Sequence, residues 1–184
     1  MSAPGSQVFL LRKSPNDPKL LVIHPDGYPM SAPPLYSVRV TSKRPNVTLS
    51  RGHMSPENII GYATVHAFSS TNELSLRGQP MSMKQSMFGD KYSFTVPHMG
   101  KFKWKPSMFS GSHELYDGSG QKLAKLGSGG LFSSEKKLEL MVPGDDFFMD
   151  LVVLTAIAAK EITKLGEKVG EAGAEVAGAV VAAT

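Results

Sequence analysis

Apolar and polar residues alternate in many short segments between residues 19 and 142. Successive side chains of a strand point to opposite faces, so this alternation is typical of strands with one buried face. Gly, Pro, Asn and Asp separate the segments, as they do in tight turns. The pattern predicts about ten to twelve short strands. The predicted strands are 19–23, 35–41, 47–50, 59–68, 73–77, 79–87, 92–96, 101–105, 113–116, 121–126 and 137–142.

A different pattern begins at Phe147, where Asp150 and Thr155 are the only polar residues before Lys160. Pro143-Gly144 separates this segment from the last strand, and Asp145 stands where it can cap a helix. The apolar stretch of about 13 residues is shorter than the roughly 20 that cross a bilayer. A helix that is apolar nearly all round must be enclosed by other elements. The sequence therefore predicts a helix over about 145–165 inside a closed antiparallel barrel.

These patterns predict one domain of the mostly β (α+β) class. Residues 1–18, with three prolines, are expected to be an irregular N-terminal arm, and 19–165 to be the barrel with its central helix. Residues 166–184 are rich in Gly and Ala, which predicts a tail that is a peripheral helix or is disordered. The residues expected in the core are Leu74, Leu76, Phe94, Phe102, Trp104, Leu138, Leu140, Leu151, Val152, Leu154 and Ile157.

Composition narrows the classes of function. The absence of cysteine excludes disulfides, thiolate zinc sites and cysteine nucleophiles. The net charge of +4 comes from the first half, since residues 1–92 hold ten basic and five acidic side chains. The five histidines lack metal-site spacing, and no nucleophile elbow is present, so we expect no enzyme and no cofactor. The N-terminal segment has no signal-peptide pattern, which favours a cytoplasmic location, with or without peripheral attachment to a membrane.

Three features together resemble the tubby C-terminal-like superfamily, which includes tubby domains, phospholipid scramblases and LURP-one-related proteins. They are Trp104 in its strand, the hairpin from Glu114 to Ala124, and the start of the helix from Phe148 to Thr155. The arrangement looks closest to small single-domain members. The resemblance implies a closed barrel threaded by its helix, and it brings in the phosphoinositide binding for which tubby domains are known.

The segment KFKWK, from Lys101 to Lys105, is the most regular alternation in the chain. In a strand its three lysines emerge on one face while Phe102 and Trp104 point into the core. Such a face suits the phosphorylated headgroups of anionic lipids, and it is also typical of a solvated strand whose lysines deter aggregation. The candidate lipid-binding residues are Lys101, Lys103 and Lys105, which Arg39, Lys43, Arg44, Arg51 and Lys84 would extend if the barrel brings them alongside.

A second cluster, Asp145, Asp146 and Asp150, precedes and enters the helix. The resemblance to scramblases raises calcium as a ligand, but the spacing of an EF-hand loop is absent. Helix capping explains the first two aspartates without a metal. Asp150 stands inside an apolar run, so we expect it to face the barrel mouth or to pair with a buried Lys, Arg or hydroxyl group.

The favoured function is a non-enzymatic binding module that is recruited to anionic phospholipid or phosphoinositide membranes through the lysine strand. Two alternatives remain open: a protein-interaction or regulatory module that uses the C-terminal tail, and scramblase-like handling of lipids. The short apolar length of the helix argues against the latter. Binding of nucleic acid is disfavoured, because the alternation sends Trp104 and the lysines to opposite faces.

Overall fold

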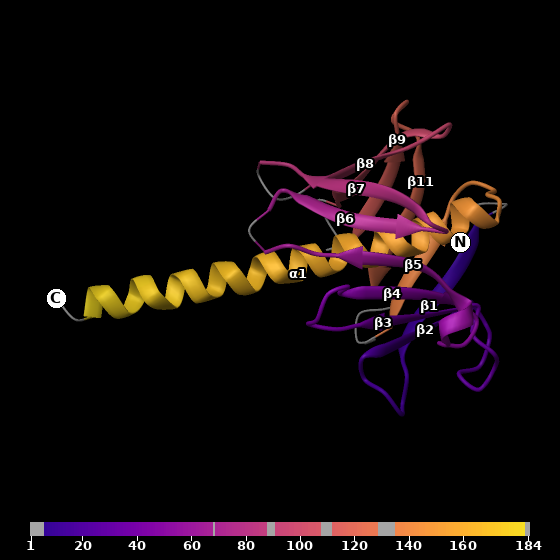
Figure 1. The fold of residues 1–184 in the computed structure, drawn as a ribbon, viewed down its shortest axis with the longest axis horizontal. Helices are drawn as coiled ribbons and strands as arrows, with labels where there is room; N and C mark the ends of the chain where they lie inside the picture. Colours follow the sequence, from indigo (N-terminus) through magenta and orange to yellow (C-terminus); the bar gives the residue numbers. More distant parts are fainter. Residues whose placement is uncertain (1–5, 68, 88–90, 108–111, 129–134, 183–184) are drawn as a thin grey trace.

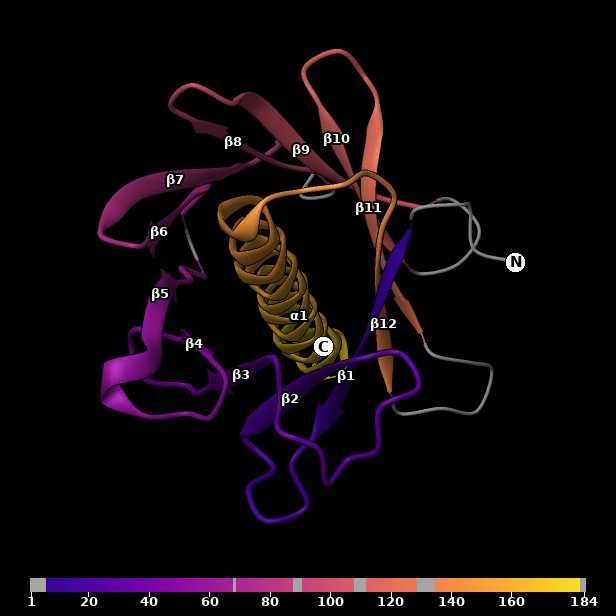
Figure 2. The same cartoon turned by 90° about the vertical axis from the view of Figure 1, so that its right-hand side faces the viewer.

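The computed structural model describes residues 6–67, 69–87, 91–107, 112–128 and 135–182, and for 171–182 it describes the backbone alone. Twelve strands form one closed barrel, in which each strand pairs antiparallel with its neighbours (Figures 1 and 2). The strands follow one another around the ring in chain order, and β1 closes the ring against β12. Their bounds are β1 Gln7–Lys13, β2 Leu20–Pro25, β3 Tyr36–Val40, β4 Val47–Arg51, β5 Ile59–Thr64, β6 Thr71–Leu76, β7 Gln79–Gln85, β8 Tyr92–Val96, β9 Gly100–Pro106, β10 His113–Asp117, β11 Lys122–Ser128 and β12 Lys136–Leu140.

Strand β1 corrects the expectation of an irregular arm over residues 1–18. Gln7–Lys13 pairs with β12 on one side and with β2 on the other. Its residues Val8 to Leu11 are all apolar, so the segment lacks the alternation that marks the other strands. Phe9 and Leu11 are buried in the core, and the strand is needed to close the barrel.

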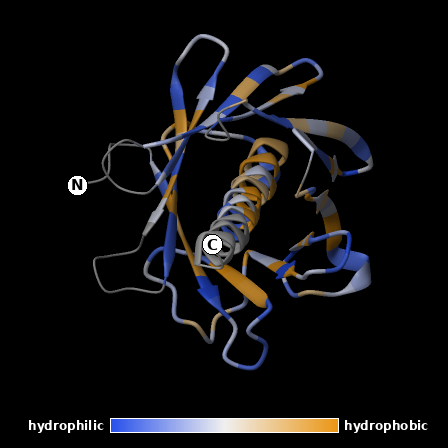
Figure 3. Cartoon of the chain, turned by 90° about the vertical axis from the view of Figure 1, so that its left-hand side faces the viewer, coloured by the Kyte–Doolittle hydropathy of each residue, from blue (hydrophilic) through white to orange (hydrophobic). Residues whose placement is uncertain are grey.

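Helix α1 (Asp146–Ala182) lies along the inside of the barrel, and Figure 2 shows it encircled by the strands. It is hydrophobic where the strands surround it (Figure 3). Helix α1 continues without a break past residue 165 to Ala182 and projects from one end of the barrel (Figure 1). Of the two states predicted for the tail, a peripheral helix or disorder, the described residues 166–182 therefore adopt the helix. All eleven residues that the sequence predicts in the core are buried.

The inner wall of the barrel lies close to α1 at Gly61 of β5. A Cβ atom there would lie 3.1 Å from Leu154 Cδ2 and 3.1 Å from the backbone oxygen of Ser75. The register between β4 and β5 also shifts next to this position, between Leu49 and Ser50. A glycine inside a strand often marks a bulge or a close approach of another element, and both features are present at Gly61.

Replacing Gly61 with alanine is therefore expected to lower the free energy of unfolding by about 1–3 kcal/mol, because the added methyl group forces the helix and the strand apart. The measurement is urea denaturation followed by circular dichroism. Gly166→Ala is the matched control, since nothing lies within 4 Å of a Cβ at that helical position. An equal loss of stability in both variants would contradict the packing argument.

Candidate anion-binding groove

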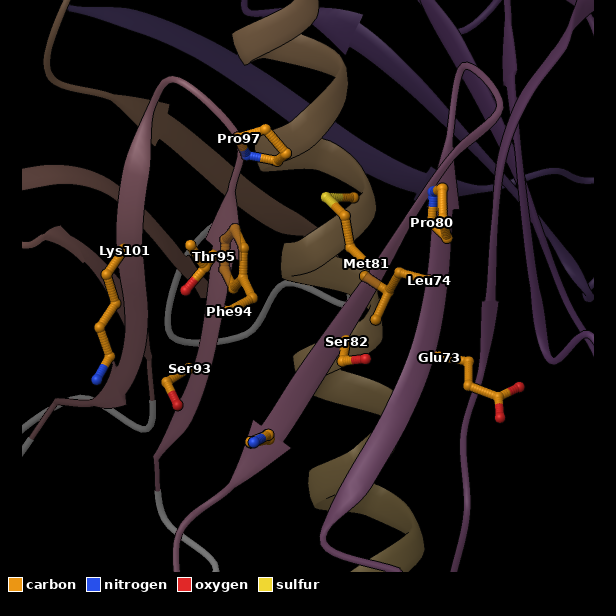
Figure 4. A pocket seen from close by; sticks show the side chains of 11 residues that line it. Glu73, Leu74, Pro80, Met81, Ser82, Ser93, Phe94, Thr95, Pro97 and Lys101 are labelled. Carbon is orange, nitrogen blue, oxygen red and sulfur yellow. The ribbon is translucent and has the colours of Figure 1, made fainter.

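The barrel wall opens between β7 and β8, where the ladder of paired residues is short. The two strands pair through only two positions, Lys84 with Ser93 and Gln85 with Tyr92. If the same register continued, Pro80 would face Pro97. Proline has no N–H to donate, so two facing prolines cannot extend the ladder. The strands diverge at this point, and α1 lies behind the opening (Figure 4).

This opening is a groove of about 790 Å³. Leu74, Met81 and Phe94 line it and are buried, so they give it an apolar floor (Figure 4). Its polar lining consists of Ser82, Ser93, Thr95, Glu73, Lys84 and Lys101. The groove therefore offers ammonium and hydroxyl donors, together with the carboxylate of Glu73, above an apolar base.

The lysines of β9 point outward, as the alternation predicts, while Phe102 and Trp104 are buried. Lys101 lies opposite Thr95 on β8, and Lys103 lies opposite Ser93. Because Lys84 of β7 also faces Ser93, Lys84 and Lys103 flank the same serine from two sides. In the part of the chain that the structure describes, these three lysines form no ion pair, so their charges are available to a ligand.

Lys105, further along the same face of β9, interacts with residues of β10. Its ammonium group lies 4.5 Å from the centre of the Tyr116 ring, and its register partner is Glu114. Glu114 accepts hydrogen bonds of 2.7 Å from Lys122 and 2.7 Å from Tyr116. Burial raises the pKa of Glu114, but the two hydrogen bonds lower it by more than burial raises it. The pKa of Glu114 is therefore below its ordinary value. Lys125 in turn faces Glu114 and Glu139. On β10, β11 and β12, lysines therefore face glutamates. Beside the groove, Lys84, Lys101 and Lys103 have no ion pair among the described residues.

The structure does not bring Arg39, Lys43 and Arg44 alongside this groove. Arg39 is on β3 and the other two are in the turn before β4. Strand β3 is six places from β9 in a ring of twelve strands, on the opposite wall. Arg39 also pairs with Asp17 at 3.1 Å. The extended patch that the sequence allows is thus divided. Arg51 is on β4 and pairs with Asp146 and Asp150, so Lys84 alone of the five residues expected to extend the patch adjoins the β9 lysines.

The three aspartates at the start of α1 have structural partners. Asp145 caps the helix, since its Oδ1 accepts a 2.8 Å hydrogen bond from the Phe148 N–H. Asp150 is fully buried, and the expectation that it pairs with a buried donor is confirmed. Its carboxylate accepts hydrogen bonds of 2.8 Å from the Tyr36 hydroxyl, 2.9 Å from Arg51 Nε and 2.8 Å from Arg77 Nε.

Two arginines thus enclose one carboxylate at the end of the barrel where α1 begins. Burial and the nearby charge of Asp150 raise the pKa of the Tyr36 hydroxyl, which therefore stays protonated as a donor. Burial lowers the pKa of Arg51, but hydrogen bonds to Asp150 and Asp146 outweigh it and raise the pKa overall. The Asp150 oxygens accept hydrogen bonds from Tyr36 of β3, Arg51 of β4 and Arg77 of the β6–β7 turn. The cluster therefore anchors the helix to the barrel wall. Among the described residues, no group of His, Asp or Glu side chains is placed to hold a metal ion.

Sequence reasoning did not single out Arg77, which lies in the turn between β6 and β7. Its φ angle is +48° and that of Gly78 is +78°. Such two-residue turns favour Asn-Gly or Asp-Gly, because both residues need positive φ. An arginine in this position goes against turn preference, and the buried carboxylate of Asp150 supplies the reason. The signal in the sequence was Asp150, because a carboxylate inside an apolar helix requires a cation from another element.

Comparison of the chain with family models, with curated proteins and with solved structures finds no match. No helical segment within the described residues combines the length and the hydrophobicity needed to cross a membrane.

Proposed function

We propose that this protein is a non-enzymatic module that binds anionic phospholipid surfaces through the groove between β7 and β8. The observation that carries the proposal is the position of three lysines, Lys84, Lys101 and Lys103, beside that groove without an ion pair among the described residues. Phosphate groups of lipids accept hydrogen bonds from ammonium groups and from hydroxyls such as those of Ser82 and Thr95. The apolar floor gives the hydrocarbon part of a lipid a surface to contact.

The proposal includes membership of the tubby C-terminal-like superfamily. It is supported by the residues of the resemblance and by the architecture, a closed barrel with a hydrophobic helix inside. A phosphoinositide headgroup is then one of the anionic lipids to be tested.

Substitution of all three lysines by alanine is expected to abolish most of the binding. Each lysine close to an anionic surface contributes about 1 kcal/mol, so the triple variant should bind about 100-fold more weakly. The measurement is sedimentation with vesicles of phosphatidylcholine alone, with added phosphatidylserine, and with added phosphoinositide. We expect pelleting with the anionic vesicles and its loss at high salt, because surface charges are screened.

The divided patch supplies a matched control. Arg39/Lys43/Arg44→Ala removes the same charge from the opposite wall of the barrel, and this variant should pellet like the unmodified protein. Equal losses in the two triple variants would mean that binding follows net charge and not the groove. The absence of pelleting with any anionic vesicle would refute the proposed function.

A further inference from the structure

A second concentration of positive charge lies at the rim where α1 leaves the barrel. Lys160, Lys164 and Lys168 are spaced four residues apart and therefore lie along one face of the helix. The strand ends around them contribute Lys13, the last residue of β1, and Lys136, the first of β12, which lie on paired strands. Lys19 immediately precedes β2, and its carbonyl accepts a hydrogen bond from Val40.

Part of this rim is hollowed. A cavity of about 370 Å³ separates the helix from the ends of β2 and β3, and its lining includes Lys19, Lys164, Lys168, Glu161, Ser42 and Leu165. None of the described residues that line it is aromatic, so it has no surface on which a nucleobase would stack. The cavity thus brings together three flexible ammonium groups and one carboxylate, that of Glu161.

Two carboxylates near this rim are engaged by arginines. Asp17 pairs with Arg39 at 3.1 Å, and Glu135 pairs with Arg12 at 2.9 Å. Glu161 approaches Lys164 at 3.9 Å, a long ion pair. The lysines of the rim therefore exceed the carboxylates that face them.

Burial and neighbouring positive charges lower the pKa of Lys160, which is only partly exposed. Burial lowers the pKa of Lys160, and although Glu161 opposes this shift, the charges of Lys136, Lys164 and Lys13 lower the pKa further. These like charges repel one another in the free protein, and a bound anion would relieve that repulsion.

We propose that this rim is a binding site for a compound with several adjacent phosphate groups, such as a triphosphate, held by Lys19, Lys164 and Lys168. Lysines four residues apart on a helix have Cβ atoms about 5–6 Å apart, and flexible stems bring their ammonium groups to neighbouring phosphates. The site does not depend on the proposed membrane function, because the β7–β8 groove is on another part of the barrel.

The test is thermal unfolding of the full chain, followed by Trp104 fluorescence, with inorganic tripolyphosphate or with sodium chloride of equal ionic strength. Tripolyphosphate should raise the Tm above the chloride value, because a ligand that binds the folded state stabilises it. Titration calorimetry should give a Kd that Lys164→Gln/Lys168→Gln weakens by about tenfold or more. These lysines are exposed, so the variant is expected to fold.

Lys101→Gln/Lys103→Gln is the matched control, with the same change of charge at the groove, and its Kd should be unchanged. The proposal is overturned if tripolyphosphate raises the Tm no more than chloride does. It is also overturned if the groove variant loses affinity while the rim variant keeps it, or if vesicles alone bind the rim and free tripolyphosphate does not.

Discussion

Replacing Asp150 with alanine is expected to lower the free energy of unfolding by about 3–5 kcal/mol, the usual cost of removing one partner from a buried charged network. The carboxylate is fully buried, and it holds Tyr36, Arg51 and Arg77 at the start of α1. Without it, the buried tyrosine hydroxyl loses its acceptor and two guanidinium groups face each other without an intervening negative charge. The measurement is urea denaturation followed by Trp104 fluorescence and by circular dichroism.

Asp146→Ala is the control for this prediction. Asp146 lies one turn before Asp150 on the helix and also pairs with Arg51, at 3.2 Å, but 79% of its side chain is exposed. Exposed ion pairs and charges near a helix N-terminus contribute about 1 kcal/mol or less. If the two variants lost the same stability, the Asp150 cluster would not anchor the helix in the way described.

Replacing Trp104 with alanine is expected to cost about 3–5 kcal/mol, because it empties a large volume between β9 and α1. The indole is fully buried, and its N–H donates a 3.0 Å hydrogen bond to Thr155 Oγ1 on the helix. Thr155 in turn donates to the Leu151 carbonyl at 2.7 Å. The substitution thus removes both apolar contact and a polar link between barrel and helix. Urea denaturation followed by circular dichroism measures the loss.

Two other variants show whether the loss comes from this contact. Trp104→Phe keeps a six-membered aromatic ring but lacks the N–H donor. It should therefore lower the free energy of unfolding less than the alanine variant does. Tyr28→Ala removes an aromatic side chain that is 53% exposed and should change the stability by about 0.5 kcal/mol or less. A small effect of Trp104→Ala, close to that of Tyr28→Ala, would contradict the packing of α1 against β9.

The alternation of residue types was sufficient to predict eleven of the strands and the enclosed helix. It worked because one face of each strand is buried against a helix that is itself apolar nearly all round. Strand β1 was missed, since four consecutive apolar residues, Val8 to Leu11, hide its alternation. For residues 166–184 the sequence left a peripheral helix and disorder both open, because four glycines there weaken the helical pattern.

The candidate site was predictable only in part. The outward direction of Lys101 and Lys103 follows from local periodicity, which depends on residues within one strand. The groove depends on the pairing register between β7 and β8, which would place Pro80 opposite Pro97. The sequence of one strand does not show how it is paired with the next. Likewise, the separation of Arg39 from Lys101 depends on the order of strands around the ring, and the pairing of Arg77 with Asp150 joins residues 73 positions apart.

The most direct measurement for the central claim uses the absence of cysteine from the chain, which allows a fluorophore to be attached at one chosen position. An environment-sensitive dye is placed at Glu73→Cys on the edge of the groove, where 73% of the glutamate side chain is exposed. The control is Asp26→Cys, an exposed carboxylate at the end of β2 on the opposite side of the ring, which matches the change in charge. If the groove faces the lipid, anionic vesicles will shift the emission of the dye at residue 73 to the blue and leave that at residue 26 unchanged. A shift at residue 26 alone, or equal shifts at both positions, would contradict binding through the groove.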